Sequence, residues 1–199
     1  MKRNALIVAF AMLTLFTVGA YGQEKDPELS KKIALSYELQ KPGPEHKRLE
    51  SMAGTWDAEI RVWTAPGAKP LTFKGRSENR IILGGRFLLS EGKSSGAGMT
   101  VETLNIIGFD RRHKKFTSIS FDTMGTYYVS AAGPFDEARK AVVMYGEDVD
   151  PQLGTQKYDF ITRIISPDQY ITEVVFKDPA HTRGQGDFKA VEVIHTRVK

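Results

Sequence analysis

The chain between residues 56 and 198 reads as about ten short strand-like segments separated by turn sequences, with no helical pattern between them. In the first of them, Trp56, Ala58, Ile60 and Val62 share one face. A period of two predicts antiparallel strands with one buried face. The expected strands are 56–63, 71–80, 81–91, 99–109, 115–122, 126–132, 140–148, 156–165, 169–177 and 188–198.

This succession of hairpins predicts an all-β protein, an antiparallel up-and-down barrel of about ten strands preceded by short helices. An open meander would leave two unpaired edges, and closure into a barrel removes them. About ten strands enclose enough space for a small ligand. A two-sheet sandwich is the competing architecture. Segments 160–165 and 188–195 are apolar on both faces, which indicates a partly polar interior but leaves the inward face undecided.

The first 22 residues predict an export signal. Lys2 and Arg3 precede an apolar run over 5–18, and Ala20 and Gly22 stand at the −3 and −1 positions of a cleavage site before Gln23. The run is short for a membrane span, so we expect an exported, periplasmic or secreted protein with no span after cleavage. A retained N-terminal anchor is the alternative. The expected organisation is signal 1–22, helical segment 23–42 and barrel domain 43–199.

Composition narrows the function classes. Removing the leader with its two basic residues lowers the formal net charge from +4 to +2, which gives no reason to expect a nucleic-acid partner. The chain contains no cysteine, so disulfides, thiol nucleophiles and thiolate metal sites are excluded. Its four histidines are not at metal-ligand spacing, and we expect neither a metal nor a cofactor. The sequence does not indicate an oligomeric state.

Two helices are expected before the strands. Asp26 is a suitable N-cap, and Pro27 suits the first helical position of a helix that ends near residue 41. A second, short helix is expected over 44–53, with Gly54 as its left-handed C-cap. Residues 92–98, rich in glycine and serine, predict a flexible loop.

Four blocks of sequence resemble a known family. They are Gly43-Pro44-Glu45-His46-Lys47-Arg48-Leu49 with Met52-Ala53-Gly54-Thr55-Trp56, then residues 78–88, 108–110 and 122–126. In this order they resemble the bacterial family of domains of unknown function numbered 1579. The resemblance covers 43–199 and implies a lipocalin-like, calycin-type β-barrel, in which Gly-x-Trp follows a short helix.

The resemblance implies the fold and not the function; from the barrel itself, we expect a protein that binds a small apolar or amphipathic molecule in its cavity. Five residues are candidates for ligand contact. Trp56 either packs at the closed end against Leu49 and Met52 or orients a ligand through its indole N–H. Arg86 is either a surface or helix-capping cation or a buried anchor for a ligand carboxylate. The candidates are Trp56, Arg86, Asp122, Tyr127 and His195.

The other three candidates lie near strand ends. Asp122 either forms an Asx turn or accepts a hydrogen bond from a ligand at the barrel mouth. One of Tyr127 and Tyr128 is expected to face inward. His195 lies in the last strand, and some related small barrels bind haem through a histidine near the C-terminus, although the residues around His195 do not match them.

Two further functions stay open. The first is a small isomerase or hydrolase that pairs a buried Asp122 or Glu173 with His46 or His195. It requires an interior carboxylate close to a histidine, and no residue spacing in the sequence demands catalysis. The second is an envelope interaction module with a filled core, in which residues 26–40 expose an apolar face.

Overall fold

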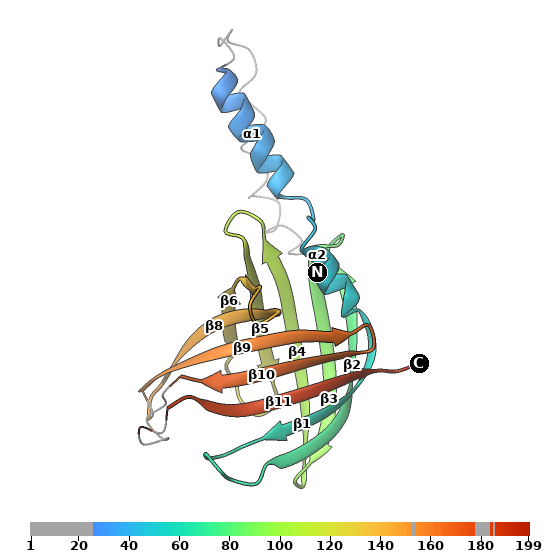
Figure 1. The fold of residues 1–199 in the computed structure, drawn as a ribbon, viewed down its shortest axis with the longest axis vertical. Helices are drawn as coiled ribbons and strands as arrows, with labels where there is room; N and C mark the ends of the chain where they lie inside the picture. The colour runs from blue at the N-terminus through green and yellow to red at the C-terminus, as the bar shows by residue number, and fades with distance from the viewer. Residues whose placement is uncertain (1–25, 153, 178–183, 185) are drawn as a thin grey trace, which may run out of the picture. The chain divides into compact units, whose positions relative to one another are not determined.

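A computed structural model describes residues 26–152, 154–177, 184 and 186–199 (Figure 1). The expected export signal lies outside these residues. The chain divides into two units, Met1–Glu38 and Leu39–Lys199. Among the described residues, no helix has the length and apolar character needed to cross a membrane.

The N-terminal unit contains most of helix α1, Pro27–Leu39. The Glu28 amide donates to Asp26 Oδ1 at 2.9 Å, which confirms Asp26 as the N-cap and Pro27 as the first helical residue. None of the residues of α1 is buried. Its large apolar side chains are therefore exposed: Leu29, Ile33, Leu35 and Tyr37.

The C-terminal unit begins with the short helix α2, His46–Ser51, and continues as a closed ten-stranded antiparallel barrel (Figure 1). Strand β7, Phe135–Asp136, is a two-residue addition that pairs with β8. The ten barrel strands are β1 Gly54–Val62, β2 Leu71–Ile82, β3 Phe87–Gly96, β4 Met99–Asp110, β5 Lys115–Asp122, β6 Val129–Gly133, β8 Ala141–Asp150, β9 Gly154–Ser166, β10 Gln169–Phe176 and β11 Phe188–Arg197.

Two pairings that join distant parts of the chain close the barrel. β1 pairs with β11, so the first and last strands are neighbours. β6 pairs with β8 through Ala131 and Gly146 and through Ala132 and Tyr145. At this second seam, a Cβ on Gly133 would lie 2.0 Å from the Val143 carbonyl oxygen, so the close approach requires glycine. The predicted barrel is confirmed, and the alternative sandwich is wrong.

The expected start of strand 81–91 is wrong, because β2 continues to Ile82 and β3 begins at Phe87 after a turn. Beyond this turn, the strand boundaries differ clearly from expectation in two places. The expected loop over 92–98 is wrong, because β3 continues to Gly96 and pairs with β4 through a two-residue turn at Ala97 and Gly98. Both turn residues have positive φ, as a type I′ hairpin requires. Cross-strand pairing thus overrides the low strand propensity of this serine- and glycine-rich stretch. In the other place, β6 begins at Val129 rather than at residue 126.

The strand register decides which face of each strand points inward. Trp56 is buried in the core, and Ala58 on the same face of β1 pairs with His195. Val191, Val193 and His195 therefore face the interior. On β9, Phe160, Thr162 and Ile164 also face inward, because strand pairing places them opposite inward-facing residues of β10.

Both faces of the late strands are apolar for two separate reasons. On β9, Ile161 faces outward, where it forms a second buried cluster with Ala141 and Val143. On β11, Ala190 is an extra residue opposite the step from Val174 to Val175, and this bulge shifts the alternation of faces. The apolar outer positions therefore do not contradict the barrel.

The main core fills the end of the barrel that carries α2. Leu49 and Met52 pack against Trp56, Leu88 and Phe116, together with Met144 and Tyr170. The Trp56 indole N–H donates to the Met52 carbonyl at 2.9 Å. Trp56 thereby fixes the end of α2 to the start of β1.

Arg197 completes this end of the barrel. Its guanidinium donates to the carbonyl oxygens of Ser51, Ala53 and Pro167 at 2.7–2.9 Å and lies 4.1 Å from the centre of the Trp56 ring. Gly54 has φ +121°, and a Cβ there would lie 2.6 Å from Arg197 Nη1. Gly54 is thus required both by its backbone conformation and by the arginine beside it.

Candidate ligand-binding site

A pocket of about 350 Å³ lies beside α2 at the filled end of the barrel. We name it the α2 pocket. Leu49 and Met52, three residues apart on one side of α2, form one part of its wall. Inward-facing residues of β4, β5, β8 and β9 form most of the rest, because alternation directs every second side chain inward. The lining residues from outside α2 are Ile107, Phe116, Phe135, Val142, Met144, Thr162 and Ile164.

Three charged residues border the α2 pocket: Arg48, Glu137 and Lys140. The Arg48 guanidinium lies 3.7 Å from the centre of the Phe135 ring, a cation–π contact. In the described part of the chain, no carboxylate forms an ion pair with Arg48. The border therefore carries one more positive than negative charge above an apolar wall.

A group of polar side chains lies on the inner face of β2, β10 and β11. We name Ser77, Asn79, Tyr170 and His195 the lumen cluster. The amide nitrogen of Asn79 donates to the Met52 carbonyl at 2.9 Å and to the Tyr170 hydroxyl at 3.0 Å. The Tyr170 ring stacks on the His195 ring, with the two planes 10° apart and the centroids 4.0 Å apart.

The lumen cluster is uncharged at neutral pH. Burial raises the pKa of Tyr170 to about 12, although the hydrogen bond from Asn79 and the nearby Ser77 hydroxyl oppose this. Burial also lowers the pKa of His195 to about 3. Ser77 is near enough to influence Tyr170, yet its Oγ has no partner in hydrogen-bond geometry.

The structure places two of the five expected ligand residues in the barrel interior. Trp56 is 1% exposed, and its indole N–H is bonded to Met52, which confirms its packing against Leu49 and Met52. His195 faces inward within the lumen cluster. The two are close neighbours there, because Tyr170 contacts both rings.

The other three expected residues lie on the surface. Arg86 is exposed and donates to the carbonyl oxygens of Gln40, Leu83 and Gly84, so the buried cation is wrong and the surface cation is confirmed. Its position follows the turn over 83–85, where three residues have positive φ. Arg86 thus stabilises a turn between β2 and β3.

Asp122 is exposed and accepts a hydrogen bond from the Met124 amide at 2.8 Å, which confirms the Asx turn. It also borders a second, open hollow of about 540 Å³ whose other charged residues are Arg76, Glu78, Glu91, Lys93 and Glu102. Tyr127 and Tyr128 are 66% and 59% exposed. The inward-facing tyrosine is therefore wrong, because these residues precede β6 and do not follow the alternation of a strand.

The pairing required by an isomerase or hydrolase is absent among the described residues. His46 is buried, its Nδ1 accepts from the Gly43 amide at 3.0 Å, and its ring packs edge-on against Phe109. No carboxylate contacts His46 or His195 in the described chain. The same residues contain no cluster of three or more side chains that could hold a metal ion.

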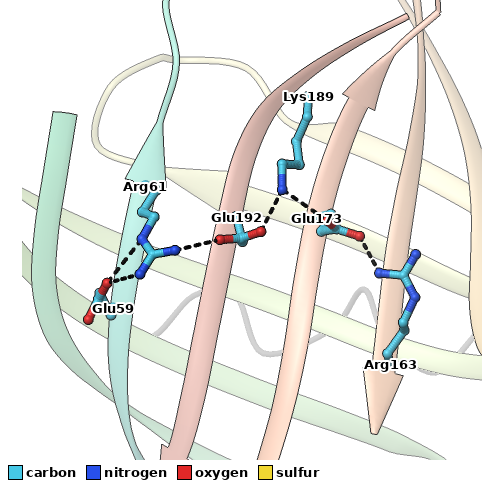
Figure 2. A network of polar contacts seen from close by, with 6 residues as sticks. All are labelled: Glu59, Arg61, Arg163, Glu173, Lys189 and Glu192. Atoms are coloured by element: carbon cyan, nitrogen blue, oxygen red, sulfur yellow. Dashed lines mark hydrogen bonds and ion pairs between the residues drawn. The ribbon is translucent and has the colours of Figure 1, made fainter. Parts of the chain in front are cut away.

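Glu173 lies on the outer face of the barrel instead. Figure 2 shows it in a row of charges across β1, β11, β10 and β9, made by Glu59, Arg61, Glu192, Lys189, Glu173 and Arg163. Burial opposes ionisation of Glu173, but Arg163 and Lys189 outweigh it and hold its pKa below the usual range. Glu173 therefore remains an anion, held between two cations.

A protein-family model matches residues 41–191 and is described as a protein of unknown function, DUF1579. The chain belongs to the DUF1579 family. This confirms the resemblance carried by the four sequence blocks. A comparison with curated proteins found no match to this DUF1579 protein.

A solved structure with low sequence identity shares the barrel fold. The S-type phycobiliprotein lyase CPES of Guillardia theta is 10% identical, with a TM-score of 0.50 over 78% of this chain and 93% of that one. A fluorescence-activating β-barrel designed de novo is 11% identical, with a TM-score of 0.43 over 75% of this chain and 96% of that one. At this identity the similarity concerns the fold alone.

Several residues of the site are not identifiable from the sequence of this DUF1579 protein. Arg48 and Lys140 are 92 positions apart, and only barrel closure brings them to one pocket. Tyr170 looks like an ordinary strand residue. Arg197 gives a weak signal, as a cation two positions after a histidine at the end of the last strand.

Proposed function

We propose that this DUF1579 protein binds a small amphipathic anion in the α2 pocket. The observation that carries the proposal is an apolar pocket of about 350 Å³ with Arg48 and Lys140 at its border. Ligand sites are typically concave and mostly apolar, with a few polar groups that orient the ligand. The apolar part would lie against Leu49, Met144 and Ile164.

The anionic group would lie at the border, near Arg48. This guanidinium is already positioned on the Phe135 ring and makes no ion pair with the described residues. An arginine binds a carboxylate through two parallel N–H donors, which adds geometric specificity to charge. Glu137 at the same border is outnumbered by Arg48 and Lys140, so the net positive charge of the border favours an anionic over a cationic head group.

We also propose that the protein acts in the periplasm or outside the cell. The supporting feature is the leader over 1–22, with its basic start, apolar run and small residues before the cleavage site. Mass spectrometry of the protein recovered from a periplasmic fraction tests this. A mature chain that begins at Gln23 is the expected result.

Octanoate tests the binding proposal, with isothermal titration calorimetry of the purified protein as the measurement. Wild-type protein is expected to bind octanoate, and Arg48→Gln to weaken binding by at least about tenfold through loss of a charged hydrogen bond. Ile164→Trp is expected to abolish binding by filling the pocket. Arg76→Gln, which removes a cation of the outer face, is the matched control and leaves affinity unchanged.

The proposal fails if octanoate does not bind, or if it binds equally well to wild type, Arg48→Gln and Ile164→Trp. One observation favours the alternative of an envelope interaction module, namely the exposed apolar side chains of α1. Crosslinking in cells distinguishes the two functions. If the protein is an interaction module, the double variant Leu29→Ser/Ile33→Ser is expected to lose its crosslinked partner. The same variant is expected to bind octanoate as wild type does.

A further inference from the structure

Three buried polar atoms of the lumen cluster have no hydrogen-bond partner. They are Ser77 Oγ, Asn79 Oδ1 and His195 Nδ1. The Ser77 and Asn79 residues are only 6% and 5% exposed. Buried polar groups in folded proteins are nearly always satisfied, so three unsatisfied atoms in one group indicate a missing partner.

The neighbouring side chains do not supply that partner. The two N–H groups of Asn79 are used by the Met52 carbonyl and the Tyr170 hydroxyl, which leaves the Oδ1 acceptor free. His195 contacts Tyr170 through ring stacking, which does not satisfy Nδ1. The cluster can therefore donate from Ser77 and accept at Asn79, while neutral His195 can do either.

Space for a partner exists along the adjoining wall of the barrel. Ala58 and Ile60 on β1, Thr172 on β10 and Val193 on β11 face inward, yet each is only half-buried. The interior beside the cluster is consequently not filled by side chains. This wall is apolar apart from Thr172, so it suits the hydrocarbon part of a ligand.

The chemistry of the cluster selects an uncharged group. The raised pKa of Tyr170 keeps it protonated and the lowered pKa of His195 keeps it neutral at physiological pH, so the cluster contains no counter-ion. Arg197, a cation close enough to act on Tyr170, is bonded to three backbone carbonyls and packed on Trp56. Burying a charge without a partner is far more costly than burying a neutral group that forms hydrogen bonds.

We propose that the lumen cluster is a second binding site, separate from the α2 pocket, for an uncharged organic molecule that both donates and accepts hydrogen bonds. A primary amide is the simplest such group. Its N–H would donate to Asn79 Oδ1, and its carbonyl would accept from Ser77 or from the protonated nitrogen of His195. The hydrocarbon part would lie along Ile60 and Val193.

Octanamide and octanoate test this site, because they differ only in the head group. Calorimetry of wild-type protein is expected to show octanamide binding that saturating octanoate does not displace. Ser77→Ala and His195→Phe are expected to weaken octanamide binding at least fivefold each. His195→Phe keeps an aromatic ring against Tyr170, so it removes the nitrogens without removing the stacking.

Stability separates a binding role from a structural one. If the orphaned atoms serve a ligand, Ser77→Ala and His195→Phe raise the melting temperature of the free protein, because each removes an unsatisfied buried group. Ser118→Ala is the matched control. Ser118 Oγ is also buried without a partner but lies on β5, so its loss raises stability and leaves octanamide binding unchanged.

Nuclear magnetic resonance of the wild type gives a readout that needs no variant. Octanamide is expected to shift the side-chain amide signals of Asn79 and the ring signals of His195. The proposal is overturned if octanamide does not bind, if Ser77→Ala and His195→Phe bind it as well as wild type, or if both variants lower the melting temperature. If only octanamide fails to bind, the proposed site in the lumen cluster is refuted and the proposed site in the α2 pocket is unaffected. If only octanoate fails to bind, only the proposed site in the α2 pocket is refuted.

Discussion

Arg197 connects the last strand to the end of α2 through the hydrogen bonds of its guanidinium. Arg197→Met keeps a long apolar side chain at this position but removes hydrogen bonds to three carbonyls, the cation–π contact and the exposed ion pair with Asp168. The bond to Ala53 is partly buried, so its loss costs about 2 kcal/mol, as is typical for a charged donor. The bonds to Ser51 and Pro167 are exposed, and water replaces them at about 0.5 kcal/mol each.

Loss of the cation–π contact adds about 0.5–1 kcal/mol. The expected destabilisation is therefore about 3.5–4 kcal/mol, a large share of the roughly 5–15 kcal/mol that stabilises a typical domain. Urea unfolding followed by circular dichroism measures it. With a slope of about 2–3 kcal/mol per molar urea, the midpoint is expected to fall by roughly 1–2 M.

Two further variants make the result decisive. Arg197→Lys keeps the charge but not the planar fork, so its stability is expected to lie between those of wild type and Arg197→Met. Arg76→Met removes an exposed arginine that pairs with Asp57, and it is expected to cost less than about 1 kcal/mol. The reasoning is refuted if Arg197→Met unfolds within about 0.5 kcal/mol of wild type, or no more easily than Arg76→Met.

Three other changes test the packing and the charges. Gly54→Ala is expected to destabilise by more than about 2 kcal/mol, because alanine disfavours positive φ and meets Arg197; equal melting temperatures for Gly54→Ala and wild type would contradict this. The pKa of His195 is near 6.5 in the unfolded chain and about 3 in the folded chain, so the folded protein loses up to about 1.4 kcal/mol of stability per pH unit as the pH is lowered through this window. In acid unfolding, the stability of His195→Phe is therefore expected to depend less steeply on pH than that of wild type. Glu173→Gln is expected to lower stability by about 1 kcal/mol above about pH 5, where the lowered carboxyl pKa keeps Glu173 ionised, and by progressively less in acid. A stability difference between variant and wild type that stays constant from about pH 7 to about pH 3 would rule out the ion pairs as the cause.

The fold was predictable because its signals are local. Alternation in β1 and the Asp26 N-cap each depend on neighbouring residues. Even so, the stretch over 92–98 was expected to be a loop, because serine and glycine have low strand propensity. Hydrogen bonds to β2 and β4 keep it in the sheet, and these partners lie elsewhere in the chain.

The candidate site was much less predictable, because its residues come from distant strands. Of the five expected residues, Trp56 and His195 lie in the interior, whereas Arg86, Asp122 and Tyr127 lie on the surface. Turns adjacent to strands attract polar and aromatic residues for local reasons, such as the Asx turn at Asp122. Sequence patterns do not distinguish such residues from those that line a cavity.

Gly54-Thr55-Trp56 illustrates what each level determines. The sequence alone determined a strand start and an aromatic residue on its apolar face, because these depend on alternation. The expected C-cap at Gly54 is wrong, because α2 ends at Ser51 with Met52 as its C-cap and Gly54 already belongs to β1. Only the tertiary structure decided that Gly54 makes room for Arg197, that Trp56 packs edge-on against Tyr170, and that the polar interior begins beside it. The partners in these contacts are far apart in the sequence, so the contacts exist only after β1 pairs with β11 and closes the barrel.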